Sequence, residues 1–196
     1  MKSTCCAAFA AVSILWLSSC FLPHTDVAGD AREYVTRTGK IILVKETHPG
    51  GQSISTIQIT TEGFVYEFLE TYEEMDPISN VMLADLNQDS FDEIYIVTAA
   101  QGSGSYGNIL AFASNRDRSL SMINFPEIND NDKYSSGYMG HDSFAIKGNS
   151  LVRTFPVYKD DDTNARPTGG TRTITYGLFP GEAMWQLRIE SVKFLK

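Results

Sequence analysis

Residues 93–112, "EIYIVTAAQGSGSYGNILAF", consist of two strand-like runs on either side of a glycine-rich segment. Gly102, Gly104 and Gly107 have the G-x-G-x-x-G spacing of a dinucleotide-binding loop, and the run before them has the β-branched composition of a strand. A dinucleotide site also needs a helix that opens at the end of the loop. The residues after Gly107 instead form a second apolar, strand-like run. The stretch therefore favours a β-hairpin with a glycine-supported tip over a nucleotide site.

The rest of the chain repeats this pattern of short β-branched and aromatic runs between turn residues, for example in residues 64–71 and 171–179. In the latter run, apolar and polar residues alternate as in a strand with one buried face. Only residues 127–135 favour a short helical turn. We expect an all-β fold, an antiparallel β-sandwich with at most one or two short helical turns, formed by residues 32–196 as a single domain.

The first 31 residues have the composition of an export signal followed by a tether. An apolar run too short to span a bilayer ends in Leu17-Ser18-Ser19-Cys20, which resembles a bacterial lipobox. We expect a lipoprotein-type signal peptide over residues 1–19, a lipid on Cys20 and a tether over residues 20–31. The protein would then be periplasmic and anchored to the outer membrane. The alternative is an ordinary secretory signal that releases a soluble periplasmic protein.

Charge and cysteine content exclude several classes of function. The formal net charge of −8 disfavours nucleic acid as a partner and suits a cationic one. The three cysteines all lie within the first twenty residues. The domain is therefore expected to have no disulfide, no thiol nucleophile and no cysteine metal site, and membrane contact is expected only through Cys20.

A calcium-loop pattern lies just before the hairpin. Asp85, Asn87, Asp89 and Glu93 occupy positions 1, 3, 5 and 9 of such a loop, and oxygen ligands at this spacing can surround one hard cation. The glycine of the sharp turn and the bidentate glutamate at position 12 are both absent. An Asx-rich turn is the simpler interpretation, so no cofactor is expected. A calcium-dependent β-sandwich binding module of the cell envelope remains the alternative function.

No catalytic centre is expected. His141 and Asp142 are neighbours in sequence and could complete a catalytic triad with Ser103 or Ser105. Neither serine has the G-x-S-x-G frame of a hydrolase nucleophile, so the sequence does not favour this triad. The acidic run at residues 160–162 is typical of a solvated loop. A small exported hydrolase that uses His141 is the least favoured class.

From about residue 64 onward, the chain resembles the bacterial periplasmic inhibitors of invertebrate-type (i-type) lysozyme. The matching segments are "DLNQDSFDEIYIVTAAQGSGSYGNILAF", "GYMGHDSFAI", "FPVYKDDDTNARPTGGTRTITYGL" and "ESVKF", in this order. The S-G-x-Y signature of that family stands here as Ser103-Gly104-Ser105-Tyr106. The segment up to residue 63 matches less clearly, and the lipobox departs from a family described as soluble.

The resemblance implies a β-sandwich that is not an enzyme and that inserts residues 103–106 into the lysozyme active-site cleft, which protects bacterial peptidoglycan. His141, Asp142, Arg166 and Arg172 lie in family-like segments. They are expected to brace the loop or to form a second contact surface.

The residue types of the loop suit this implied role. A lysozyme cleft contains two catalytic carboxyl groups, to which the neutral hydroxyls of Ser103 and Tyr106 can donate. Tyr106 adds aromatic area for a hot-spot contact. We expect Gly102, Gly104 and Gly107 to allow close approach and positive φ angles.

Overall fold

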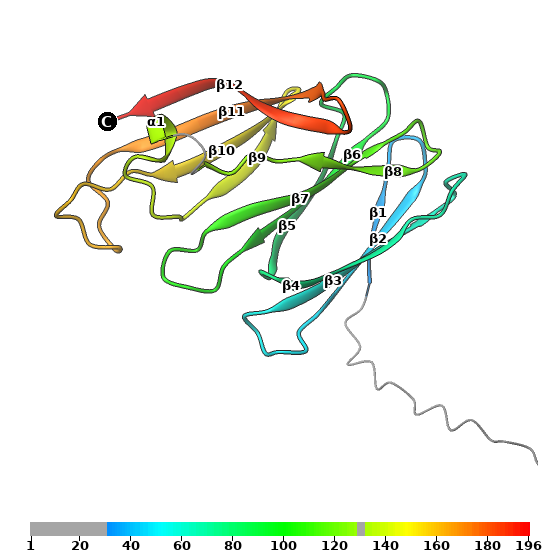
Figure 1. The fold of residues 1–196 in the computed structure, drawn as a ribbon, viewed down its shortest axis with the longest axis horizontal. Coiled ribbons are helices and arrows are strands. Elements are labelled where there is room, and N and C mark those ends of the chain that lie inside the picture. The colour runs from blue at the N-terminus through cyan, green and yellow to red at the C-terminus, as the bar shows by residue number, and fades with distance from the viewer. Residues whose placement is uncertain (1–30, 129–131) are drawn as a thin grey trace, which may run out of the picture.

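The computed structural model describes residues 31–128 and 132–196, in which twelve strands form two sheets (Figure 1). The four-stranded sheet has the order β1-β2-β3-β4, and the eight-stranded sheet has the order β5-β6-β7-β8-β12-β11-β10-β9. The elements are β1 (Arg32–Val35), β2 (Ile41–Thr47), β3 (Ser55–Glu62), β4 (Leu69–Met75), β5 (Ile78–Ala84), β6 (Glu93–Ala99), β7 (Gly107–Ser114), β8 (Leu120–Asn124), α1 (Asp132–Ser135), β9 (Ser143–Lys147), β10 (Ser150–Pro156), β11 (Thr171–Pro180) and β12 (Trp185–Leu195). The expected signal peptide, Cys20 and nearly all of the tether lie outside the described residues.

Strand β6 is buried on both of its faces because it serves two hydrophobic cores. Ile94 and Ile96 pack with β2 and β3 of the small sheet, whereas Tyr95 and Val97 point to the other side. Strand β7 alternates in the same way. The β5–β8 half of the large sheet is therefore a middle layer, with the small sheet on one face.

The second core lies inside the eight-stranded sheet, because that sheet curls until its two halves face each other. The inward side chains from β9–β12 include Phe155, Ile174 and Tyr176, which cluster with Tyr95 from β6. The two halves join where β8 pairs with β12. Figure 1 shows the β9–β12 half beyond β7 and β8, on the side away from the small sheet.

The all-β prediction is confirmed, and α1 falls within the predicted helical turn at residues 127–135. Two details differ from the expectation. The β8–β12 pair is parallel, whereas the other strand pairs between described residues are antiparallel. The strand predicted at residues 64–71 is wrong over residues 64–68, since Phe64 and Phe68 reach the core from a loop and β4 begins only at Leu69. In the described ranges, no helix is long and apolar enough to cross a membrane.

Substitution of Phe112 on β7 tests the packing between the small sheet and the large sheet. Its side chain is 1% exposed and its ring meets those of Phe68 and Tyr72 edge-on or tilted, at 5.3 and 5.9 Å between centroids. Phe112→Ala should lower the free energy of unfolding by about 3–5 kcal/mol in urea denaturation, because a cavity would open between the layers. Val65→Ala, at a side chain that is 67% exposed, should change it by less than about 0.5 kcal/mol. Equal effects of the two substitutions would contradict this packing.

Candidate functional site

The predicted hairpin is present, with β6 and β7 paired antiparallel and joined by residues 100–106. The amide of Ala100 donates to the carbonyl of Tyr106 at 2.9 Å and closes the base of the loop. The amide of Ser105 donates to the carbonyl of Gly102 at 3.1 Å and forms a turn at its tip. No helix follows the loop, so the arrangement required for a dinucleotide is lacking.

The expected positive φ angles at Gly102, Gly104 and Gly107 are wrong. The left-handed residue of the loop is Ser105, with a φ of +41°. Gly104 instead allows the ring of Tyr106 to lie close to the loop backbone, because a Cβ at position 104 would be 2.5 Å from that ring. This tight contact sets the position of the ring beside the loop backbone.

Two neighbouring segments hold the carbonyl groups of the loop. Gly140 has a φ of +87°, and a Cβ on it would lie 2.0 Å from the carbonyl oxygen of Gly104. The same oxygen accepts a hydrogen bond from the amide of His141 at 2.5 Å. The side-chain amide of Asn164 donates to the carbonyl of Ser103. Two successive peptide units of the tip are thereby fixed from outside the hairpin.

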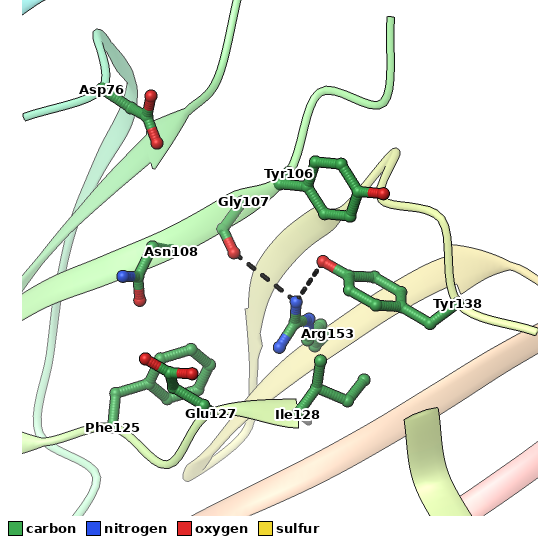
Figure 2. A pocket seen from close by; sticks show the side chains of 9 residues that line it. All are labelled: Asp76, Tyr106, Gly107, Asn108, Phe125, Glu127, Ile128, Tyr138 and Arg153. Carbon is green, nitrogen blue, oxygen red and sulfur yellow. Dashed lines mark hydrogen bonds between the residues drawn. The ribbon is translucent and has the colours of Figure 1, made fainter. Parts of the chain in front are cut away.

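A buried ion pair lies beneath the base of the loop. Arg153 Nε is 2.6 Å from Asp142 Oδ1, and their side chains are 3% and 0% exposed. Asp142 Oδ2 accepts the amide of Gly107 at 2.8 Å and the hydroxyl of Tyr138 at 2.5 Å. Arg153 Nη2 donates to the Tyr138 hydroxyl at 2.7 Å and to the Gly107 carbonyl at 3.5 Å, as Figure 2 shows. The first residue of β7 is thus bound through both of its backbone polar groups.

The protonation states of Tyr138 and Arg153 in this network are fixed near neutral pH. Burial and the hydrogen bond to Asp142 raise the pKa of the Tyr138 hydroxyl above its usual value. Burial alone would lower the pKa of Arg153, but the hydrogen bond and negative charge of Asp142 outweigh it and raise the pKa. The network therefore keeps one hydrogen-bonding pattern over the physiological pH range.

The side chains of Ser103 and Tyr106 in the loop are exposed to solvent. Tyr106 is 48% exposed and packs edge-on against Tyr138, with 5.6 Å between ring centroids. Ser103 is exposed, and no hydrogen bond to its hydroxyl is found within residues 31–128 and 132–196. Beside Tyr106 lies a recess of about 190 Å³ whose lining includes the carboxyl side chains of Asp76 and Glu127 (Figure 2). The surface thus combines a hydroxyl, an aromatic ring and acidic groups.

The structure brings His141 and Asp142 next to the loop but does not make them a catalytic pair. His141 Nε2 lies 3.1 Å from Asn164 Oδ1, and its ring stacks on that of Tyr158 at 6.2 Å. Asp142 is committed to Arg153, Tyr138 and Gly107 instead. The triad drawn with Ser103 or Ser105 is therefore not formed among the described residues.

Arg166 and Arg172 lie elsewhere. Arg172 donates to the carbonyl groups of Tyr134 and Ser136, at 2.5 and 2.9 Å, and so holds the segment around α1. Arg166 is exposed, and its amide closes a short turn with the carbonyl of Thr163. Neither arginine makes a hydrogen bond or ion pair to residues 100–106 among the described residues.

Three residues of the site were missed by sequence reasoning: Tyr138, Arg153 and Asn164. Arg153 carried a usable signal, because it is the charged residue within an otherwise apolar or small-residue strand, "SLVRTF". A cation at a core position requires a buried anionic partner. Tyr138 and Asn164 carried no local signal, since their partners are distant in sequence.

The calcium-loop residues are also brought together. Asp85, Asp89 and Glu93 each offer one carboxylate oxygen, and these oxygens lie within 4.8 Å of one another. Asn87 lies beside them, with its side-chain amide 3.2 Å from Asp89 Oδ2. Burial is the largest cause that raises the pKa of Glu93 to about 8.

Comparisons with known proteins give two solved structures. No protein-family model and no curated protein sequence matches the chain. The crystal structure of PliI-Ah, the periplasmic lysozyme inhibitor of I-type lysozyme from Aeromonas hydrophila, is similar with a TM-score of 0.42 and 23% identity, and covers 49% of this chain and 87% of that chain. The structure of Aeromonas hydrophila PliI in complex with Meretrix lusoria lysozyme is similar with a TM-score of 0.40 and 21% identity, over 48% of this chain and 81% of that chain.

Asp142→Asn tests the ion pair. The amide would leave the Arg153 charge buried without an anion, so the free energy of unfolding should fall by about 3–5 kcal/mol in urea denaturation. Replacing both residues, as in Asp142→Asn with Arg153→Met, should cost less than the sum of the two single changes, because no buried charge remains. Additive losses would show that the two side chains do not depend on each other.

Glu93 should make stability depend on pH. In the unfolded chain its carboxyl loses its proton near pH 4.5, whereas the folded protein holds it up to about pH 8. The folded state therefore binds one more proton between these values, and the free energy of unfolding should fall by up to about 1.4 kcal/mol per pH unit as pH rises. Urea denaturation in EDTA should show this slope for the native sequence relative to Glu93→Gln. Parallel pH profiles of the two proteins would contradict the assignment.

Proposed function

We propose that this chain is a proteinaceous inhibitor of i-type lysozyme in the bacterial periplasm and that it inserts Ser103-Gly104-Ser105-Tyr106 into the lysozyme active-site cleft. The observation that carries the proposal is that the hairpin tip combines a fixed backbone with exposed side chains. The backbone of the loop is held by buried or partly buried groups, while the hydroxyl of Ser103 and the ring of Tyr106 face outward. The S-G-x-Y resemblance supplies the identity of the partner.

Such a loop binds at a low entropic cost because it is already ordered. Tethering of the Ser103 and Gly104 carbonyl groups and the close contact of Gly104 with Tyr106 restrict the free protein to the binding shape. A preorganised loop loses little conformational freedom when it enters a cleft, and more of the contact energy contributes to affinity.

Inhibition would be occlusion without chemistry. Ser103 and Tyr106 would donate hydrogen bonds to the catalytic carboxyl groups of the lysozyme and displace the sugar substrate. The two carboxyl groups of the recess, Asp76 and Glu127, would receive a cationic side chain from the rim of the cleft. The net charge of −8 would speed the encounter with a cationic lysozyme.

The proposal also covers the domain as a whole, its membrane anchor and the residues beside the loop. Residues 32–196 would act as one inhibitory domain, presented from the outer membrane through a lipid on Cys20. His141 and Asp142 would position the loop through Gly104 and Gly107 rather than touch the lysozyme.

The proposal is tested by titrating the purified protein against i-type, chicken-type and goose-type lysozymes in a cell-lysis assay. We expect stoichiometric and selective loss of i-type activity. A folded sample that inhibits none of the three enzymes would overturn the proposed function.

Tyr106→Ala should weaken inhibition of an i-type lysozyme by about 2–4 kcal/mol, which raises the inhibition constant roughly 30- to 1000-fold. The reason is that the variant lacks the aromatic ring that would become buried in the lysozyme cleft. Tyr66→Ala is the matched control, since Tyr66 is 59% exposed on the connection between β3 and β4. It should leave the inhibition constant unchanged. Equal inhibition by a folded Tyr106→Ala variant and by the control would exclude the loop as the inhibitory element.

A further inference from the structure

A buried carboxylate oxygen at the start of β6 lacks a partner. Glu93 is 0% exposed, and its Oε2 accepts the amide of Leu86 at 2.7 Å and the hydroxyl of Tyr95 at 3.3 Å. Its Oε1 is buried without a hydrogen-bond partner among the described residues. Such an atom costs free energy unless something outside the protein satisfies it.

Other oxygen ligands converge on the same place. The carboxylate oxygens of Asp85, Asp89 and Glu93 lie within 4.8 Å of one another. Ligand oxygens of calcium lie 2.3–2.6 Å from the ion, so oxygens on opposite sides of it are about 5 Å apart. The spacing of the three carboxyl groups therefore fits a single ion between them.

We propose that the loop between β5 and β6 binds one calcium ion through Asp85, Asn87, Asp89 and the unpartnered oxygen of Glu93. Calcium suits this site better than magnesium because calcium accepts an irregular set of oxygen ligands. Magnesium instead demands short bonds in a nearly ideal octahedron. The ion would replace the proton that the buried Glu93 carboxyl group holds in the ion-free protein, and it would supply the positive charge that the ionised group needs.

The loop has its binding shape without an ion. Asp85 Oδ1 and Oδ2 accept the amides of Asp89 and Ser90, both at 3.0 Å, and Asn87 Oδ1 accepts the amide of Asp89 at 2.9 Å. The missing glycine at the sharp turn is no obstacle, because Ser90 itself adopts the required left-handed conformation, with a φ of +74°. The absent glutamate at position 12 is replaced by Glu93 at position 9.

Arg37 lies at the edge of this cluster and contacts one of the proposed ligands, Asp85. Its Nη1 is 2.9 Å from Asp85 Oδ2 and its Nε is 2.8 Å from Asp92 Oδ1. It makes no ion pair with Asp89 or Glu93 among the described residues. Its side chain is 49% exposed, so it can keep its contact with Asp92 and release Asp85 when the ion binds.

The site is structural and independent of the proposed inhibition. Glu93 is the first residue of β6 and Ala99 the last, which places the calcium loop about 20 Å from the hairpin tip along the strand. An ion here fixes the start of the strand that serves both cores. Glu93→Gln should accordingly leave lysozyme inhibition unchanged.

The test uses the purified protein, freed of metal with EDTA and titrated with calcium chloride in calorimetry and in thermal unfolding. We expect the unfolding temperature to rise by roughly 5–10 °C at a hundredfold excess over the dissociation constant, and to rise less with magnesium. Glu93→Gln keeps the size of the side chain but cannot ionise to bind the cation, so it should fold and lose the shift. Asp89→Asn, at an exposed side chain, should weaken calcium binding at least about tenfold.

Asp162→Asn is the matched control, because Asp162 also accepts backbone amides in a turn but lies outside the cluster. It should keep the full calcium shift. Absence of both heat and a shift in unfolding temperature up to about 10 mM calcium would overturn the proposal. A full shift in Glu93→Gln and Asp89→Asn would overturn it as well, since the ion would then bind elsewhere.

Discussion

The buried pair of Arg153 and Asp142 is the interaction on which the candidate site depends. Four aromatic rings surround the guanidinium, those of Phe125, Tyr138, Phe144 and Phe155, at 5.0–5.8 Å. A buried ion pair adds little net stability compared with apolar packing, but the loss of one partner is costly. The pair therefore acts as a positional constraint: while it is intact, the start of β7 and the segment around Tyr138 have only one arrangement.

The hairpin that carries the loop gains stiffness from the two cores. Because β6 and β7 are packed on both faces, a shift of either strand would disturb the small sheet and the curled large sheet at once. The loop at residues 100–106 thus extends from two strands that are packed on both faces. Rigidity at its base and exposure at its tip are what a preorganised binding element requires.

Local sequence signals were enough for much of the fold. The alternation in residues 171–179 places Ile174 and Tyr176 in the core as expected, and the hairpin follows from two strand-like runs around glycines. The strand predicted at residues 64–71 fails over residues 64–68 because apolar residues there pack from a loop. The parallel β8–β12 pair joins segments about sixty residues apart, and no local pattern encodes such a pairing.

The sequence was enough to name the exposed side chains of the candidate site, but not the residues that hold the loop in place. Ser103 and Tyr106 follow from the loop and its resemblance, whereas Asn164 and Arg153 reach the loop only through the tertiary fold. The left-handed conformation also fell on Ser105 rather than on a glycine, because hydrogen bonds to the neighbouring carbonyl groups fix the turn.

The proposed function requires that the loop and the sugar substrate compete for the same cleft of the lysozyme. The most direct measurement is the affinity of this protein for an i-type lysozyme at rising concentrations of an oligosaccharide that fills the active site. We expect the apparent dissociation constant to rise linearly with the oligosaccharide concentration, as for mutually exclusive ligands. An unchanged dissociation constant with the cleft occupied would contradict it, because binding would then lie outside the active site.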